Sequence, residues 1–455
     1  MRFIEGEVSE IGELKAYSGE VVVDGNGCAL LPSLADHHLH LFALAAKTNS
    51  LLCGPPDICS AEAFIALLGE QSAGLDWLRG IGYHESVVGL IDRQWLDKYG
   101  PARPIRIQHR GGRLWILNTL GLDVLRRDHE KDLPVGLDIE QGHLFDEDLW
   151  LRHALGGQPP DLGEVSRVLA SFGVSCVTDM TPQNDAQTVV LFKKLQAQGK
   201  LRQRVLMAGV EGLDFVAQRR SLQKEKQLST MLEIGPYKIH LHEAQLPEFS
   251  ELCRAISTSH SNQRPIAVHC VTEVELVFAL AALKESGAID GDRIEHASVT
   301  PPELMSQIKE LGLLVVTQPN FVSERGDQYL NDVESREVPW LYRCRTLIEA
   351  GIDLAGGTDA PFGHPDPWLA MKAAVNRQSI GGRVLNLAEA LTPEQALELF
   401  LGCPYTPARM REVVVGAQAD LCLLDRKWHQ AREILSSEMV RATWCNGALI
   451  YDRVD

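Results

Sequence analysis

Eight short apolar runs with the character of buried β-strands recur along the chain and alternate with stretches of helical apolar spacing. They lie at residues 34–38, 173–179, 203–208, 237–242, 266–270, 293–296, 313–317 and 352–356. Regular alternation of strand and helix predicts a parallel sheet, and eight strands are the number that closes a barrel. The sequence therefore predicts an α/β protein built on a (β/α)8 barrel of the TIM type.

The two ends of the chain carry short β-rich runs that are too few to fold separately, because an isolated pair of strands is marginal in water. Strands are expected at 3–8, 20–24, 413–415, 419–424, 440–443 and 448–451. We expect both ends to join in one small β-sandwich made of residues 1–31 and 405–455, with the barrel spanning residues 32–404.

One gap interrupts the rhythm of the barrel. The first and second predicted strands lie about 130 residues apart, whereas a βαβ unit needs only about 30. The excess, residues 60–160, is predicted to be an inserted subdomain beside the mouth of the barrel, with strands at 76–83 and 104–108 and a helix at 114–125. Insertions at that face usually shape specificity.

The composition of the chain limits the classes of molecule that it is expected to bind. The 455-residue chain carries a net charge of −17, which disfavours nucleic acid and anionic membrane surfaces. It has no apolar run long enough to span a bilayer and no signal-like N-terminus, and its ten cysteines include no Cys-x-x-Cys pair. We expect a cytoplasmic protein with reduced thiols and a small-molecule substrate; a homo-oligomer is compatible with the sequence.

Histidines cluster where the first barrel strand ends. Residues two apart share a face of a strand, so His38 and His40 point the same way while His37 points to the opposite face. Neutral imidazole is the commonest protein ligand for a metal. The pair therefore predicts half of a metal site.

Other strand ends carry ligand-type residues as well: Lys238, His240 and His242 share a face of the fourth strand, His269 ends the fifth, His296 ends the sixth, and Asp359 follows the eighth. Each alone has an ordinary structural explanation, such as a hydrogen-bonded histidine, a lysine reaching solvent or a helix-capping aspartate. Their coincidence at the chemically active ends of one barrel favours a metal centre.

With these residues in place, the chain resembles the amidohydrolase superfamily, and most closely its amidohydrolase-3 branch of metal-dependent hydrolases similar to N-substituted formamide deformylase. The resemblance rests on the metal pattern and on residues 115–118, 293–297, 318–319, 358–361 and 416–421.

This resemblance implies hydrolysis of a non-peptide C–N bond, of amide or N-acyl type, by a metal-activated water. It implies one or two divalent ions, zinc in the first place. His38, His40 and Asp359 would bind the more buried ion, with Asp359 also the catalytic base and then acid. The more exposed ion would be held by His269 and His296, and Lys238, carboxylated, would bridge the two.

The chain departs from the branch at several places, among them residues 32–34 before the first histidine pair and Arg113 where the branch has a histidine. Candidate substrate contacts are Arg113, His109 and Trp115 in the insertion, Gln318 after the seventh strand and His364 after the eighth. Aromatic and basic residues there suit a substrate with an apolar or aryl part and a carboxylate.

Three alternatives stay open. A one-metal deaminase of a ring C–N bond would use His242 as ligand and Glu243 as proton shuttle. A non-catalytic barrel would keep the fold as a binding module. A thiol enzyme would use Cys270 beside His269, although a cysteine at such a position is more often a small buried residue.

Overall fold

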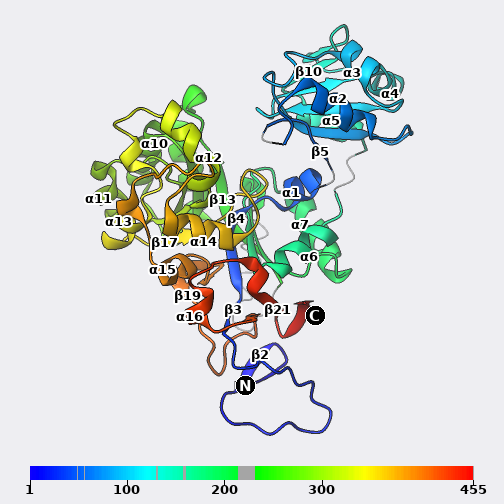
Figure 1. Cartoon of the computed structure of the whole chain (residues 1–455). Coiled ribbons are helices and arrows are strands. Elements are labelled where there is room, and N and C mark those ends of the chain that lie inside the picture. The colour runs from blue at the N-terminus through cyan, green and yellow to red at the C-terminus, as the bar shows by residue number, and fades with distance from the viewer. Residues whose placement is uncertain (49, 56, 130–131, 157–159, 214–230, 454–455) are drawn as a thin grey trace. The chain divides into compact units, whose positions relative to one another are not determined.

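The computed structural model describes residues 1–48, 50–55, 57–129, 132–156, 160–213 and 231–453. The chain folds as two compact units, the first made of Met1–Leu41 with Leu162–Asp455 and the second of Phe42–Asp161 (Figure 1). In the described part of the chain, no helix is both long and apolar enough to cross a membrane.

The described residues of the first unit form an eight-stranded sheet in the order β17-β16-β15-β14-β13-β12-β11-β4. Its strands are β4 (Leu34–Leu39), β11 (Val174–Asp179), β12 (Arg204–Gly209), β13 (Leu232–His240), β14 (Ile266–Cys270), β15 (Arg293–His296), β16 (Leu314–Thr317) and β17 (Leu354–Gly356). Neighbouring strands pair in parallel throughout. The predicted (β/α)8 barrel is confirmed.

The barrel closes where β17 meets β4, at the residues that follow the regular strands. The Asp359 backbone N–H donates to the carbonyl of His38 at 2.7 Å, and that of His40 donates to the carbonyl of Ala360 at 2.8 Å. The seam therefore runs through three of the predicted metal ligands.

A buried carboxylate reinforces this seam. Asp36 accepts hydrogen bonds from the backbone N–H of Thr358 at 3.0 Å and from its hydroxyl at 2.5 Å. Burial raises the pKa of Asp36 to about 7. Close approach also requires a glycine, because a Cβ atom at Gly357 would lie 2.5 Å from the Cβ atom of His38.

Helices surround the barrel strands (Figure 1). The described helices of the first unit are α6 (Gly163–Ser171), α7 (Ala186–Ala197), α9 (Phe249–Ser261), α10 (Glu273–Ser286), α11 (Pro302–Glu310), α12 (Asn320–Asp332), α13 (Cys344–Glu349), α14 (Pro367–Asn376), α15 (Pro393–Glu398) and α16 (Trp428–Ala431), with 3-10 turns at Glu211–Leu213, Glu243–Gln245, Val338–Trp340, Leu387–Glu389 and Ser437–Met439. Helix α1 (Leu41–Thr48) belongs, apart from Leu41, to the second unit.

Helix α10 shows why these segments are helical. Thr272 caps its N-terminus in a capping box with Glu275, and the helix ends at Gly287, whose φ is +78°. Between these signals, buried residues recur at helical spacing and pack into the core between helices and barrel: Leu276, Ala279, Leu280 and Leu283.

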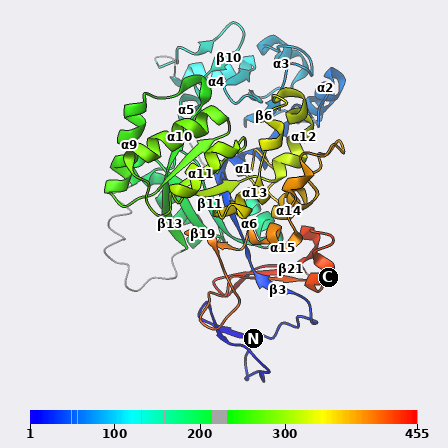
Figure 2. The same ribbon diagram turned by 90° about the vertical axis from the view of Figure 1, so that its left-hand side faces the viewer.

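Segments from both ends of the chain share one antiparallel sheet. Within residues 1–48 and 231–453, its four strands are β3 (Leu30–Pro32), β20 (Leu421–Leu424), β21 (Val440–Cys445) and β22 (Ala448–Asp452), in the order β22-β21-β20-β3 (Figure 2). Two hairpins lie apart from this sheet, β1 (Arg2–Ile4) with β2 (Glu7–Glu10), and β18 (Gly402–Cys403) with β19 (Thr406–Met410).

Two predicted strands of this region are wrong. Residues 20–24 and 413–415 are not in strands, and Val21 is 94% exposed. Valine runs favour strands only where a neighbouring strand completes the ladder, and no strand of the described residues pairs with either segment.

The second unit begins at Phe42, earlier than the expected residue 60. Its described residues form a six-stranded mixed sheet in the order β5-β6-β7-β8-β10-β9. The elements are β5 (Leu51–Leu52), α2 (Ala61–Gly69), β6 (Leu78–Tyr83), α3 (Arg93–Tyr99), β7 (Ile105–His109), β8 (Leu114–Leu117), α4 (Thr119–His129), β9 (Leu137–Asp138), β10 (His143–Phe145) and α5 (Asp148–Ala154).

The helix predicted at 114–125 is wrong in its first part. Residues 114–117 form β8, which pairs with both β7 and β10, and the helix begins only at Thr119. The run Leu-Trp-Ile-Leu is short and almost wholly buried, so its apolar pattern does not distinguish a central strand from a helical turn.

Candidate metal centre

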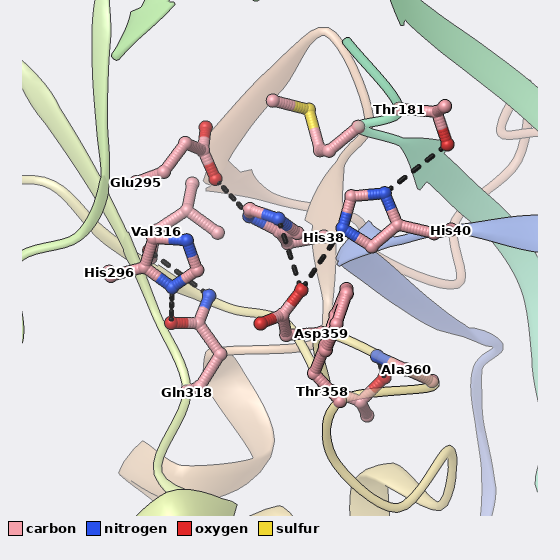
Figure 3. Close-up of polar contacts among 12 residues, drawn as sticks. His38, His40, Thr181, Glu295, His296, Val316, Gln318, Thr358, Asp359 and Ala360 are labelled. Carbon is pink, nitrogen blue, oxygen red and sulfur yellow. Dashed lines mark hydrogen bonds and ion pairs between the residues drawn. The ribbon is translucent and has the colours of Figure 1, made fainter. Parts of the chain in front are cut away.

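Three predicted ligands converge at the barrel seam. His40 Nε2 lies 3.1 Å from Asp359 Oδ1, and His38 Nε2 lies 3.4 Å from the same oxygen (Figure 3). One ligand-type atom from each residue lies within 4.8 Å of the others. Two nitrogens and a carboxylate oxygen at these separations are a donor set that a divalent ion binds.

A buried carboxylate fixes the orientation of His38. The Nδ1 atom of His38 donates to Glu295, whose other oxygen accepts from Arg293, and all three side chains are buried. A carboxylate oxygen only accepts, so the His38 proton lies on Nδ1 and the lone pair of Nε2 faces Asp359. Burial also lowers the pKa of His38 well below its ordinary value, which keeps the ring neutral.

Two further imidazoles have their Nδ1 atoms on oxygen partners. His296 Nδ1 donates to Gln318 Oε1 at 2.7 Å, and His40 Nδ1 pairs with the hydroxyl of Thr181 at 3.2 Å (Figure 3). Such partners set the tautomer of a metal-binding histidine. His38 and His296 thus present Nε2 as a ligand atom, and the Thr181 hydroxyl, which can accept as well as donate, allows the same tautomer at His40.

The predicted ligands of a second ion lie beside this group. The His296 ring centroid lies 4.8 Å from that of His38 and 4.3 Å from that of His269. Among the described residues, His269 and His296 form no three-ligand group comparable to that of His38, His40 and Asp359. Two imidazoles therefore lack a third donor there, unless Lys238 provides it.

Lys238 is the least satisfied group of the site. It lies on β13, and its buried Nζ atom has no hydrogen-bond partner among the described residues. Burial lowers its pKa to about 8. A buried amine without a partner is costly, so the site fits a further group that would bind this nitrogen.

Two of the ligand positions have unusual backbone conformations. His296 has φ of +70° and Asp359 has φ of +54°, both in the left-handed region that non-glycine residues seldom adopt. Such residues cost on the order of 1–3 kcal/mol each and cluster at functional sites.

The backbone conformation of His296 also explains why sequence reasoning missed Glu295. Glu295 and His296 are adjacent on β15, so regular alternation would place them on opposite faces. Both instead contact His38, Glu295 through a hydrogen bond and His296 through its ring. Thr181, which follows β11, and Asp36 were missed too, because neither belongs to a metal-ligand pattern.

One predicted placement is wrong. Strand β13 ends at His240, and His242 lies beyond it as the exposed cap of the turn Glu243–Gln245, with its Nδ1 accepting from the Ala244 backbone N–H. His242 therefore does not share a face of β13 with Lys238, as the sequence had predicted.

The structure shows the surroundings of the predicted substrate contacts in the first unit, whose role stays a prediction. Gln318 is fully buried and accepts a hydrogen bond from His296 Nδ1. His364 is exposed, and its Nδ1 accepts from the backbone N–H of Asp366.

Within the second unit, the predicted contacts have partners of their own. Arg113 is exposed and ion-paired with Asp146, and His109 lies 3.0 Å from Glu85. Trp115 is only 2% exposed and lies in the core.

A second group of ligand-type residues occurs in this unit, namely His84, Glu85 and His109. Here the Nδ1 atoms accept backbone N–H groups, from Ser86 at 3.2 Å and from Gly111 at 3.1 Å. The neutral rings therefore carry their protons on Nε2, facing Glu85. That tautomer suits hydrogen bonding to the carboxylate and is the opposite of the one at the barrel seam.

Comparison with known proteins places the geometry in context. Residues 21–451 match the family described as the amidohydrolase family. The putative amidohydrolase YtcJ of Bacillus subtilis is 24% identical over 94% of this chain and 90% of its own length. The N-substituted formamide deformylase of Arthrobacter pascens is 23% identical over 99% and 93%.

A similar fold occurs in the crystal structure of an uncharacterized metal-dependent hydrolase from Pyrococcus horikoshii. The TM-score is 0.71 at 22% identity, over 90% of this chain and 88% of that one.

Proposed function

The chain belongs to the amidohydrolase family, and from this premise we propose that it hydrolyses a non-peptide C–N bond, of amide or N-acyl type, in a small molecule. The reaction uses a water activated by a divalent ion, zinc in the first place. The N-substituted formamide deformylase among its relatives supports this substrate class.

The orientation of His38, His40 and Asp359 carries the proposal. The Nε2 atoms of both rings face the same carboxylate oxygen, at 3.4 and 3.1 Å. Glu295 holds the His38 proton on Nδ1, so the Nε2 lone pair of His38 and the Asp359 oxygen repel each other. A cation between them offsets this repulsion, and imidazole nitrogen with carboxylate oxygen is a set that zinc accepts.

Lys238 completes the site for a second ion in this proposal. Its reaction with carbon dioxide requires the neutral amine, and a pKa of about 8 makes that form far more abundant at neutral pH than an ordinary pKa of 10.5. The carbamate oxygens would supply the anionic donor that His269 and His296 lack.

Asp359 moves the proton in this scheme. A bound divalent ion lowers the pKa of its water from ~15.7 toward ~7. The Asp359 carboxylate then accepts a proton from the attacking water and passes it to the leaving nitrogen, as a general base and then acid. Its left-handed backbone, tied by its N–H to the His38 carbonyl, holds the carboxylate against both histidines.

Metal content tests the proposal. We expect one to two zinc ions per chain by elemental analysis, reduced in His38→Ala and unchanged in the control His84→Ala, whose ring has the opposite tautomer. Activity on N-formyl and N-acyl amines should be lost with a strong chelator and return with zinc. Wild-type protein with less than about a tenth of an ion per chain, after growth with added zinc, would rule the proposal out.

A further inference from the structure

An exposed aromatic ring adjoins the candidate metal centre. Phe362 lies three residues after Asp359, is 60% exposed, and places its ring edge-to-face on His40, with centroids 5.6 Å apart and planes at 89°. The sequence offers no motif that marks this residue. Single exposed apolar side chains are common on protein surfaces, so the exposure alone assigns no role.

The loop that carries Phe362 is held in place. The Phe362 N–H donates to the carbonyl of Asp359 at 2.7 Å, and its own carbonyl accepts from Arg325 at 2.8 Å. The next turn is tied as well, because the His364 N–H donates to Glu324 at 3.0 Å. Helix α12 supplies both side chains. A ring held this way loses little conformational entropy when it contacts a ligand.

Phe362 is also one end of a continuous series of ring contacts. The series runs Phe362, His40, His38, His296, His269, His240, with consecutive centroids 4.2 to 5.6 Å apart. The two terminal rings, those of Phe362 and His240, are exposed, while the predicted ligands between them are buried or half-buried.

The second exposed ring is badly placed to share a metal ion with its neighbour. His240 stacks on His269 with centroids 4.2 Å apart and planes only 26° from parallel. An imidazole binds a metal through a lone pair in the plane of its ring, so two stacked rings direct their lone pairs along separate planes. We therefore do not count His240 among the candidate metal ligands.

We propose that Phe362 forms an aromatic subsite that selects substrates with a flat, apolar group, such as an aryl ring, next to the scissile C–N bond. The inference rests on the proposed function for its reaction and adds the substrate class. Aromatic pairs in edge-to-face or stacked contact are favourable beyond the area that they bury. The single imidazole of His40 separates Phe362 from the candidate ligand atoms, so aryl group and scissile bond must be close neighbours.

Two metal-binding probes that differ only in this group test the proposal: benzohydroxamate, with an aryl ring, and acetohydroxamate, with a methyl group. Titration calorimetry on the zinc-loaded protein needs no turnover. We expect wild type to bind the aryl probe about tenfold more tightly. Phe362→Ala should abolish most of this preference and leave acetohydroxamate affinity unchanged, and Phe362→Leu should keep part of it.

The matched control is Phe249→Ala, which removes another exposed phenylalanine from α9 and should preserve the preference. Wild type without an aryl preference, or equal weakening of both probes in Phe362→Ala, overturns the proposal. An intact aryl preference in a protein that hydrolyses no amide contradicts the proposed function and leaves the subsite standing.

Discussion

The partner of Nδ1 decides what each histidine of this chain can do. At the barrel seam, oxygen atoms of Glu295 and Gln318 accept from Nδ1 and free Nε2 for a metal. In the second unit, Nδ1 of His84 accepts a backbone N–H, and Nε2 keeps its proton. In both groups the ligand-type atoms lie within 4.8 Å of one another, so distance does not distinguish them. The direction of the hydrogen bond at Nδ1 distinguishes His38 from His84.

Glu295→Gln tests this distinction. The amide can turn its NH2 group toward His38 and favour the wrong tautomer, and it leaves Arg293 without its buried carboxylate. Loss of such an outer partner typically costs 10- to 100-fold in metal affinity. We expect a decrease in zinc affinity of that order, measured by competition with a chromophoric chelator. Glu85→Gln is the matched control, because Glu85 also pairs with a histidine, and its zinc affinity should equal that of wild type. Equal affinities in both variants would contradict the assignment.

A second prediction concerns the pH dependence of the metal-free protein. Burial lowers the pKa of Lys238 from 10.5 to about 8. Between these values the unfolded chain holds a proton that the folded chain has lost, so this residue makes stability rise with pH across that window. Below about pH 8 the folded state carries the full free-energy cost of burying the charged Lys238. The free energy of unfolding, measured with urea in CO2-free buffer, should therefore rise with pH between about 8 and 10.5 in wild type, and the rise should be smaller in Lys238→Met. Parallel curves would mean that Lys238 is not a destabilising buried amine.

At the scale of elements, sequence pattern located seven of the eight barrel strands to within two residues at either end, because both faces of a barrel strand are buried and leave an apolar run. For β13 the same reasoning began the strand at residue 237 instead of Leu232 and extended it to His242, although the strand stops at His240. It also placed strands where no neighbour completes the ladder, at residues 20–24. The apolar pattern of a segment shows that it is able to form a strand, and a neighbouring strand decides whether it does.

The sequence also predicted the positions of the metal ligands, because these residues lie at strand ends. It did not predict the residues that hydrogen-bond to the ligands. The hydrogen bond from His38 to Glu295 joins residues 257 apart in sequence, and that from His40 to Thr181 joins residues 141 apart. No local pattern reports such a contact. Period-two reasoning also fails at His296, since its φ of +70° breaks the alternation of faces.

The seam between β4 and β17 gives an element-scale prediction. Gly357→Ala would place a Cβ atom 2.5 Å from that of His38 and 2.7 Å from its backbone nitrogen, so the strands must move apart. We expect lower zinc content and a destabilisation of about 1–3 kcal/mol, as for overpacked interiors. Gly212→Ala is the control, because no atom of the described residues lies within 4 Å of its Cβ position. Normal zinc content and stability in Gly357→Ala would show that the seam tolerates separation.

At the scale of the whole molecule, the chain combines a barrel with a second unit that has its own core. The elements of that unit pack around a cluster that includes Phe64, Tyr83, Leu96 and Ile107, all drawn from the continuous segment 42–161. All the proposed metal ligands lie in the first unit. We therefore expect the stability of the second unit and metal binding by the first unit to be independent of each other.

Calorimetry of the full chain tests this separation. Phe64 is fully buried, with its ring stacked on Trp95 at 5.2 Å, so Phe64→Ala should destabilise the second unit by about 3–5 kcal/mol. Zinc binds only the folded barrel in our proposal and should stabilise it by about 2.7 kcal/mol at a free concentration 100 times its Kd. We expect two unfolding transitions, one lowered by Phe64→Ala and unmoved by zinc, the other raised by zinc and unmoved by the substitution. A single transition that responds to both changes would show that the units unfold together, and that the second unit contributes to the stability of the metal centre.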